Sequence, residues 1–522
     1  MKKAILWIGC LSSLALSVPV SAQYASDIFR YSEINQTGSA RFQAIGGNHA
    51  ALGADPSVIS GNPAGLGFYN RSEFTISPAV TNVSTNTSYL GQGSSASKGN
   101  GNVAQASLVI TSQPGFQRKW KRTSMGISYS RQQSFQNIFN YRGTNNRSAY
   151  VDKVVEDANG VGWTDKQYDD EYAANGNKYY YLDEAYFGLQ MIYPTKYDAT
   201  NKVYGAPYAR DDRNNATRQD GSFDSKGSQS QWSISYGGNY DDKLYVGGSV
   251  GFTGVKYSYT HSLQDTYVNG TVFRSSVLDE EFSVRSNGIN ATFGVIYKLS
   301  PLVQLGGSIS TPTFAKISKE TFSQYVSADY IKGSIKNTQG QDVGPTDTDI
   351  ALVPNDFQYS MTGPLRGSGG ATFFLGKSGF ITGTVEYVGY AGMRASSSYF
   401  QNSQDNDDFK NNTKADVKDL YKNVVNARVG GEYRAGVFRA RVGLAYLADP
   451  YRENLDNIKR DKVLYSAGLG IRNDRFFADI SGTFSSFKSA FTPYVLNNQQ
   501  DYSSASIANK TVNAVLTVGV FF

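Results

Sequence analysis

Apolar and polar residues alternate one by one along several segments of the chain. In the last segment Val512, Leu516 and Val518 fall on one face, and Asn513 and Thr517 fall on the other. A membrane-spanning β-strand shows this alternation over about ten residues, because one face meets lipid and the other faces the barrel lumen. The same pattern recurs at 244–252, 289–297, 425–433 and 438–446. It predicts an all-β protein built from transmembrane strands.

The connections between these strands give a second, independent signal. Short turns alternate with long polar connections, as in a barrel with periplasmic turns and extracellular loops. The strands of a soluble β-sandwich also alternate apolar and polar residues, but no physical constraint places all the long loops of a sandwich at one end. If 123–141 is one interrupted strand, the connections predict a 14-stranded antiparallel barrel. The short turns lie near 114–120, 240–242, 300–301, 377–378, 435–436 and 473–474, and the long connections span 81–102, 142–230, 261–280, 317–356, 393–420, 449–462 and 489–510.

The beginning of the chain predicts export. Two lysines precede an apolar run at 4–20, and small residues end it, which is typical of a secretory signal peptide. We expect residues 1–22 to be removed by cleavage before Gln23. The single cysteine, Cys10, lies inside this run. The mature chain would therefore have no thiol for a disulfide or a thiolate zinc site.

Composition narrows the class further. Charged residues make up only 18% of the chain and aromatic residues 13%. No apolar run beyond the signal peptide reaches the ~20 residues that a membrane helix needs. The formal net charge of +6 is too small an excess to indicate nucleic-acid binding. An exported chain of this kind fits a barrel in the outer membrane of a Gram-negative cell.

The C-terminal strand ends on an aromatic residue, Phe522. This is the form of the signal by which insertion machinery recognises outer-membrane barrels, although a last core strand could also end this way. Aromatic residues near strand ends suit the girdles at the two membrane interfaces. Those expected in the girdles are Tyr257, Tyr259, Tyr387, Tyr390, Tyr446, Phe484 and Phe487.

A glycine- and alanine-rich stretch, residues 39–68, precedes the first strand. Two short helical pieces fit it: residues 41–53, and a piece that starts at Asp55 with Pro56 at its first position. Neither piece is long enough to be stable alone, so each must pack against something larger. The stretch is either a flexible linker or a compact plug, and we refer to residues 39–68 as the plug below.

A lumen inside 14 strands is wider than its own side chains can fill. Without an internal segment such a barrel would leak. We therefore expect residues 23–72 to form a small, partly helical hatch inside the lumen. The first strand would follow directly, at 73–80. Residues 73–522 would then form the barrel and its long extracellular loops.

The plug contains the motif residues Gly46, Gly47, Asn62, Pro63, Ala64 and Gly65. With the preceding Ser-Ala-Arg-Phe at 39–42, they resemble the N-terminal hatch of the FadL/TodX family over about 50 residues. Members of this family are outer-membrane transporters of long-chain fatty acids and aromatic hydrocarbons. The rest of the chain resembles them only in architecture, and the connection at 142–230 makes it longer than typical members.

The resemblance implies a mechanism in which a hydrophobic ligand reaches an apolar pocket above the hatch and leaves sideways, where the third strand kinks inward. It also implies that Asn62 hydrogen-bonds backbone near the kink and that Pro63 fixes the turn. The alternation of the third strand breaks where polar residues crowd together. These kink candidates are Arg131, Gln132, Gln133 and Ser134. Alternatively, the strand ends at 131 and a loop follows.

Charged residues on two adjacent strands are expected to face the lumen. They are Arg428, Glu432, Arg434, Arg439 and Arg441. They could form an ion-pair ladder with Asp479 and Glu386 that holds the hatch, or they could bind the carboxylate of a fatty acid. The large connection at 142–230 could form an external ligand groove or simply cap the barrel.

Catalysis is not expected. The chain has two histidines, His49 and His261, and neither lies in a metal-binding or nucleophile motif. We expect no catalytic residues, no metal and no cofactor. The expected partners are a hydrophobic small molecule, outer-membrane lipid and the barrel insertion machinery, but not nucleic acid, and the protein would be a monomer. Two alternatives stay open: a scaffold for type IX protein secretion, and haem uptake through His49.

Overall fold

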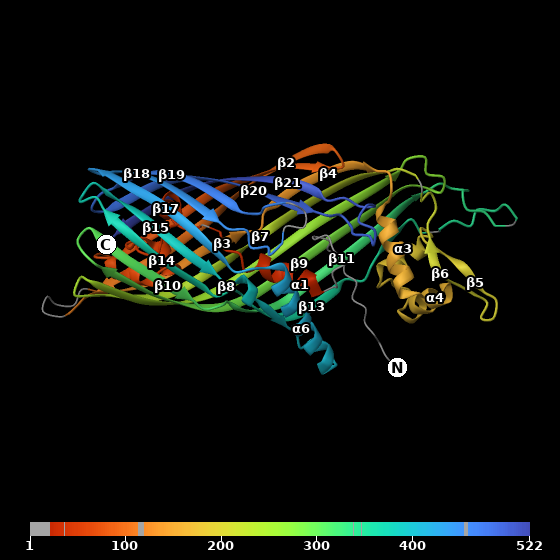
Figure 1. Ribbon diagram of the computed structural model, residues 1–522, viewed down its shortest axis with the longest axis horizontal. Helices are drawn as coiled ribbons and strands as arrows, with labels where there is room; N and C mark the ends of the chain where they lie inside the picture. The colour runs from red at the N-terminus through yellow and green to blue at the C-terminus, as the bar shows by residue number, and fades with distance from the viewer. Residues whose placement is uncertain are drawn as a thin grey trace.

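The computed structural model describes residues 21–35, 37–112, 119–213, 215–337, 339–345, 347–453 and 458–522. Almost all of the expected signal peptide and most of the expected turn near 114–120 lie outside the described residues. The described chain forms a closed 14-stranded antiparallel barrel with an N-terminal helical segment, which confirms the predicted fold class (Figure 1). Among these residues, no helix is long and apolar enough to cross a membrane.

The ring closes where the first strand meets the last. Glu73 is paired with Phe521 at one end of this seam, and Ser88 with Ser506 at the other. The strands of the ring are β1 (Glu73–Tyr89), β2 (Gln92–Ser112), β3 (Trp120–Ser134), β7 (Thr217–Tyr240), β8 (Leu244–Tyr267), β9 (Phe273–Lys298), β10 (Val303–Ser310), β14 (Arg366–Phe374), β15 (Gly379–Val388), β17 (Val424–Ala435), β18 (Phe438–Leu447), β19 (Lys462–Arg472), β20 (Phe476–Phe491) and β21 (Ala505–Phe521). Four of them have a second segment across a break, namely β4 (Asn137–Asn145), β11 (Phe314–Tyr330), β13 (Asn355–Thr362) and β16 (Arg394–Ser396), and the short β12 (Asp349–Ala351) pairs with β11.

The outer surface of the ring carries the apolar face of the alternating strands. Val442 is 64% exposed, whereas Thr517 on an inward-facing position is fully buried. Large apolar side chains are exposed on strands all around the ring, and such a belt is what a barrel presents to lipid. The outward residues include Ile76, Met125, Ile234, Phe252, Phe293, Leu305, Phe373, Ile381, Val429, Leu444, Leu469, Ile480 and Leu516.

Several expected loops are strands. The predicted long connection at 81–102 is a hairpin in which β1 and β2 continue to Tyr89 and Gln92, and 261–280 is mostly β8 and β9. The first strand is therefore longer than 73–80. Beyond the membrane, both faces of a strand meet water or polar groups, so the apolar alternation that marks a strand is lost. For that reason the sequence of these extensions predicts loops and not strands.

The large connection at 142–230 covers one end of the barrel (Figure 1). It folds into α3 (Tyr150–Val161), α4 (Asp165–Ala174), α5 (Leu182–Gly188), β5 (Tyr193–Asp198) and β6 (Val203–Ala209). We call these five elements the cap. They bury Tyr168, Tyr186 and Leu189 in one apolar cluster with rim residues such as Leu263 and Tyr494.

Part of the predicted aromatic girdle is wrong. Tyr257, Tyr259 and Tyr390 are buried inside the barrel instead of facing lipid, because they lie on inward positions of their strands or next to the helices in the lumen. Tyr387 and Tyr446 are exposed on the outer surface as expected.

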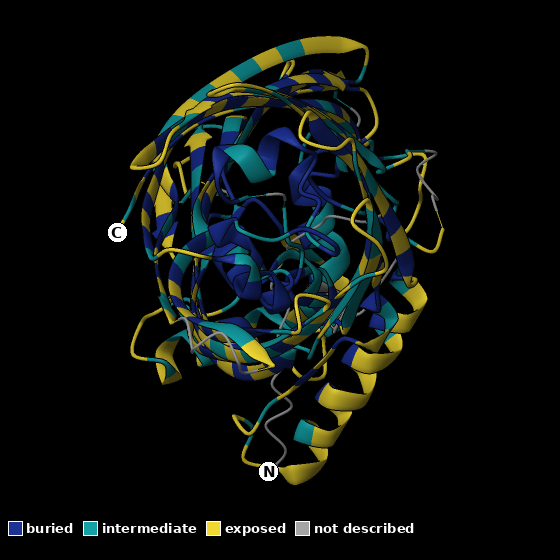
Figure 2. Ribbon diagram, turned by 90° about the vertical axis from the view of Figure 1, so that its left-hand side faces the viewer, coloured by how far each residue is buried: buried dark blue, intermediate teal, exposed yellow. Residues whose placement is uncertain are grey.

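The N-terminal segment lies inside the ring of strands (Figure 2). It forms α1 (Ser21–Arg30), α2 (Ala40–Ala44) and the 3-10 helices η1 (Pro56–Ile59) and η2 (Pro63–Phe68). The predicted helix at 41–53 is thus wrong beyond Ala44. Gly46 and Gly47 follow with φ of +76° and +73°, a left-handed conformation that ends an α-helix.

A second helical insertion replaces part of the wall. After β15 the chain forms the 3-10 helix η3 (Tyr390–Gly392), then β16, and then α6 (Ser403–Leu420) before β17 begins. Figure 1 shows α6 at the wall of the barrel next to α1.

Candidate functional site

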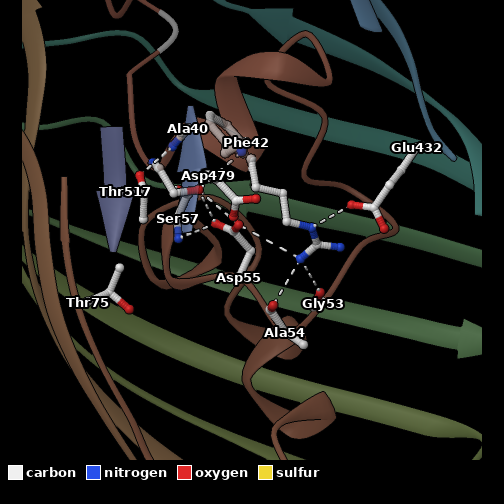
Figure 3. A network of polar contacts seen from close by, with 12 residues as sticks. Ala40, Phe42, Gly53, Ala54, Asp55, Ser57, Thr75, Glu432, Asp479 and Thr517 are labelled. Carbon is white, nitrogen blue, oxygen red and sulfur yellow. Dashed lines mark hydrogen bonds and ion pairs between the residues drawn. The ribbon is translucent and has the colours of Figure 1, made fainter. Parts of the chain in front are cut away.

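The plug is organised by caps made by small polar residues. Asp55 caps η1 by accepting from the Ser57 amide at 2.9 Å, as the sequence predicts for this residue, and its carboxylate also accepts from the Ser39 hydroxyl. Ser39 in turn caps α2, and its own amide donates to Ser57 at 3.0 Å. These bonds tie the beginning of the plug to its middle, at the start of η1 (Figure 3).

Arg41 connects the plug to the barrel wall. Its guanidinium donates to the Ala54 carbonyl at 2.9 Å within the plug and to Glu432 on β17 at 3.3 Å (Figure 3). The Ala40 amide donates to Thr517 on β21 at 2.7 Å, and the Thr517 hydroxyl bonds Ser77 on β1 at 2.8 Å. The plug is therefore hydrogen-bonded to the last strand at the barrel seam, and Thr517 links it to the first strand.

Four of the five predicted lumen charges form ion pairs. Glu432 accepts from Arg441 and Arg434, each at 2.7 Å, and Arg441 also donates to Asp479 at 2.6 Å. All but Arg434 in this group are buried. Burial in low-dielectric surroundings penalises an unpaired charge. Loss of any one member would therefore take compensating charge from a buried partner and destabilise the cluster.

The remaining predicted charges lie apart from this cluster. Arg428 pairs with Glu386 at 2.9 Å, and Arg366 lies 3.7 Å from the same carboxylate. Arg439 instead donates to the carbonyls of Gly436 and Phe438 in its own turn. The five predicted residues thus divide into two ion-pair groups and one turn residue.

Asn62 lies at a different wall from the one that the family resemblance implies. Its side-chain amide donates to Ala50 within the plug at 2.6 Å, and to the carbonyls of Val295 on β9 and Gly307 on β10 at 3.4 and 3.2 Å. It makes these bonds far from the β3 break because η2 packs its N-terminal end on β8 and β9. Its carbonyl oxygen also caps η2 through the Ala64 amide, with Pro63 at the first position.

Glycines of the barrel wall make room for the plug backbone, and sequence reasoning did not identify them. A Cβ on Gly430 would lie 2.2 Å from the Ile45 carbonyl, and one on Gly443 would lie 2.1 Å from the Gly46 amide. Gly294 faces Asn62 in the same way. The sequence could have indicated them, because they occupy inward-facing strand positions and the plug is built from small residues.

The third strand breaks where its polar residues crowd. β3 ends at Ser134 and β4 begins at Asn137, with a bulge between Arg131 and Gln133. Pairing between β2 and β3 stops at Gln105 and Ser130. Beyond this point β4 stays on β7 but leaves the neighbouring edge of β2.

β4 passes beneath the β1–β2 hairpin instead of extending the wall. Thr85 of β1 donates to the Ile138 carbonyl at 2.6 Å, and the Gln136 side chain donates to the Lys98 carbonyl at 2.9 Å. Irregular backbone of this kind is tolerated at membrane depth only where protein or a cavity covers it.

A cavity of about 460 Å³ lies beside this break. Its wall is mostly apolar on one side, with phenylalanines from α1, the β3–β4 break and the strands β7 and β20. Lys462 and Glu33, which also line the cavity, form an ion pair, and the Lys462 ammonium lies 4.7 Å from the centre of the Phe487 ring. The principal apolar residues are Phe29, Phe135, Phe139, Phe223, Leu464, Phe487 and Phe491.

A second, polar cavity of about 130 Å³ lies between the plug and β7–β15. His49 lines it, and the His49 ring nitrogen Nδ1 lies 3.2 Å from the Gly47 carbonyl. Burial, together with the nearby Arg428 guanidinium, lowers the pKa of His49, so this imidazole is neutral at physiological pH.

The other histidine takes part in a buried hydrogen-bonded chain. His261 contacts Tyr141 on β4 at 2.9 Å and Glu280 on β9 at 3.0 Å. It lies within β8, although the sequence predicts that the long connection at 261–280 begins at this residue. Within the described ranges, no three His, Cys, Asp or Glu residues are grouped so that they could hold a metal ion.

Solved structures with the same arrangement of strands exist. The toluene transporter TodX of Pseudomonas putida superposes with a TM-score of 0.50 at 13% identity, over 94% of this chain and 99% of that one. The chain has the TodX fold. The resemblance seen in the plug motifs is therefore confirmed at the level of architecture. No protein-family model and no curated protein matches the sequence.

Other proteins with the TodX-type barrel show the same low identity. A FadL homologue of Pseudomonas aeruginosa matches with a TM-score of 0.49 at 11% identity, over 94% of this chain and 99% of that one. A monoaromatic hydrocarbon channel, CymD, matches with a TM-score of 0.46 at 12% identity and the same coverage.

Proposed function

We propose that the protein carries hydrophobic small molecules across the outer membrane of a Gram-negative cell. The observation that carries this proposal is the apolar cavity of about 460 Å³, which lies inside a plugged barrel and against a break in its wall. A cavity of this size suits a small ligand. Long-chain fatty acids and aromatic hydrocarbons are the substrate classes that fit an apolar cavity with cations at its edge.

Release occurs sideways, through the break between β2 and β3. The plug blocks the direct path to the periplasm, since Arg41 ties it to Glu432 and wall glycines contact its backbone. The sheet is unpaired beyond Gln105 and Ser130, next to the Phe135 ring in the cavity wall. A ligand that leaves there passes from the apolar cavity to the edge of the apolar belt, where the outward Val103 of β2 is exposed.

The remaining properties follow from this role. The protein is a monomer without enzymatic activity. Its signal peptide, residues 1–22, is removed on export, and the C-terminal strand ending in Phe522 is recognised by the insertion machinery. The hatch of residues 23–72 lies in a barrel formed by 73–522, and within the hatch the plug, residues 39–68, works as a fixed stopper.

Haem uptake and a secretion scaffold receive less support. His49 borders a cavity of only about 130 Å³, below the ~300 Å³ of ordinary ligand pockets. The connection at 142–230 is packed as a cap over the barrel, so a groove for a cargo protein does not follow from it.

The test is to purify the protein in a mild detergent and identify co-purifying hydrophobic molecules by mass spectrometry. Phe491→Asp places a charge in the cavity wall and should remove the bound molecule. Tyr180→Asp, at an exposed position of the cap, should retain it. If no ligand is bound and an exported protein co-purifies instead, the scaffold function replaces transport.

Lateral release has its own test. Cysteines at Lys98→Cys and Gln136→Cys, on either side of the break, can be bridged with a bifunctional thiol reagent. Bridging should leave ligand binding intact and slow delivery of the ligand into the cell. Unchanged delivery by the bridged protein would place the exit elsewhere.

A further inference from the structure

The ring of strands has another interruption, between β15 and β17. β15 ends at Val388 and β17 begins at Val424. β16 extends the wall by pairing with β13 through Ser360 and Ser396, but in the described part of the chain no strand pairs with its other edge. The outward residues of β13 at this level are polar, so the interruption lies beyond the apolar belt. They are Asp356, Gln358 and Ser360.

α6 closes this interruption from the outside. Its buried residues are Phe409, Thr413 and Val417, which recur every four positions and so form one stripe along the helix. The rest of α6 is largely exposed and charged. The wall is here a single helix that packs mainly through side chains, with one backbone bond from the Arg452 amide to the Leu420 carbonyl at its end. In the paired parts of the ring the wall is a sheet held by backbone hydrogen bonds.

α1 closes the same interruption from the inside. The Tyr24 ring lies 5.0 Å from that of Phe409 on α6 and 5.3 Å from that of Phe357 on β13. The Phe29 ring stacks on Tyr421 at 4.7 Å, just after α6. The two helices therefore meet through aromatic rings in the plane of the wall.

α1 also forms part of the boundary of the apolar cavity. Ser26, Phe29 and Arg30 line that cavity, so the same helix has the cavity on one side and the wall interruption on the other. Movement of α1 would join the two spaces.

The position of α1 leaves buried polar atoms unsatisfied. Asp27 Oδ2 and the Tyr31 hydroxyl are buried and have no hydrogen-bond partner among the residues that the structure describes, which raises the free energy of this position. The backbone is hydrogen-bonded to the barrel just after α1, where Arg366 donates to the Ser32 carbonyl at 2.6 Å and the Asn35 amide donates to Gln132 at 3.0 Å. These bonds define a fixed point about which α1 can swing.

The capped end of the barrel is closed more firmly. The first amide of α3, on Tyr150, donates to Asp265 on β8 at 2.6 Å and so ties the cap to the barrel. Within the capping connection, Arg210 forms a buried bidentate pair with Asp152. The cap also shares one continuous apolar cluster with the barrel rim. Opening it would expose this cluster and break the buried bond between Tyr150 and Asp265. The contact between α1 and α6 also belongs to one apolar cluster, and the aromatic rings named above close it.

We propose that hydrophobic ligands reach the apolar cavity through the side of the barrel, between α1 and α6, and not through the capped end. The proposal rests on the transport function, for which it supplies the route inwards. Access begins beyond the apolar belt, at the level of the lipid headgroups, and α1 is the gate.

The route can be measured without knowing the natural ligand. Leu464→Cys places a thiol in the cavity wall, and the mature chain has no other cysteine after removal of the segment that contains Cys10. N-phenylmaleimide, a small aromatic thiol reagent, is added to intact cells, and the labelling rate of this thiol is followed. Phe29→Ala weakens the gate, and Tyr186→Ala, at a buried position of the cap, is the matched control.

Phe29→Ala should raise the labelling rate about tenfold, the shift in an opening equilibrium expected from loss of aromatic pairs, while Tyr186→Ala leaves it unchanged. Phe409→Ala, on the other side of the gate, should act like Phe29→Ala and serves if that variant folds poorly. A rise only in Tyr186→Ala, or no rise in either gate variant, overturns the proposal. Neither result affects the co-purification test, so failure of the gate and failure of the transport function remain distinguishable.

Discussion

The plug and α1 both lie inside the barrel, but different forces hold them. Buried ion pairs and close backbone contacts fix the plug. Arg41 pairs with Glu432, and the plug backbone lies directly against wall glycines such as Gly430. α1 is held mainly by rings, of which Phe29 and Tyr24 contact several others. Aromatic packing tolerates displacement, whereas a buried ion-pair cluster does not. A stopper and a gate can therefore occupy one lumen.

The largest expected effect is at the centre of the ion-pair cluster. Glu432→Gln would leave the guanidinium groups of Arg41, Arg434 and Arg441 without their shared carboxylate. Breaking a buried pair in this way costs about 3–5 kcal/mol. We expect the plug to loosen, which cells would show as sensitivity to large antibiotics that an intact outer membrane excludes.

Asp220→Asn is the control for this change, because Asp220 pairs with the exposed Arg142 outside the lumen, and exposed pairs contribute little. Equal antibiotic sensitivity in the two variants would contradict the difference drawn between plug and surface charges.

Close approach of the backbone gives the next effect. Gly430→Ala would place a methyl group 2.2 Å from the Ile45 carbonyl, and such overpacking costs about 1–3 kcal/mol. Gly369→Ala, on a strand position with nothing within 4 Å, should have no comparable effect. Thermal unfolding in detergent compares the two, and equal melting temperatures would show that the plug does not rest on this glycine.

A smaller effect is expected for α1. Phe29→Ala removes ring contacts with Tyr421 and Tyr390, each of which contributes about 0.5–1.5 kcal/mol. The barrel should unfold at its usual temperature, but trypsin should cleave faster after Arg30. If the variant instead becomes permeable to antibiotics, α1 and the plug move as one body and the comparison fails.

The smallest effect is expected at Arg439, which the sequence groups with the other lumen-facing charges. Arg439 bonds only carbonyls of its own turn among the contacts described, so Arg439→Ala should change the free energy of unfolding by less than about 0.5 kcal/mol. Arg441→Ala, two residues away and bound to Glu432 and Asp479, should cost several times more by the same urea titration.

The membrane-spanning part could be predicted because lipid imposes a simple rule on every strand. Val442 and Leu516 face outward as their alternation predicts, and the described turns lie where short connections were expected. Outside the lipid-facing part of the strands this rule does not apply, and the sequence no longer predicts the structure. The extension of β1 and β2 past the membrane has no apolar face, and Tyr257 and Tyr259 face a lumen filled by helices that local sequence cannot place.

The candidate site was predictable in its residues but less so in its partners. The motif around Asn62 could be recognised, yet its contacts with Val295 and Gly307 depend on how the plug is rotated inside the ring. The ion-pair partners Asp479 and Glu386 were foreseeable because they share a lumen with the arginines. The contact of Arg41 with Glu432 was not, since no periodicity links the hatch to a strand.

The hydrogen bonds at the seam bear on how the molecule is assembled. Ala40 of the plug bonds Thr517 on the last strand, and Thr517 bonds Ser77 on the first. Closing the barrel and seating the plug are therefore coupled through one side chain, Thr517, which contacts both the plug and the first strand. A substitution at this position would disturb the joint between the terminal strands and the fit of the stopper together.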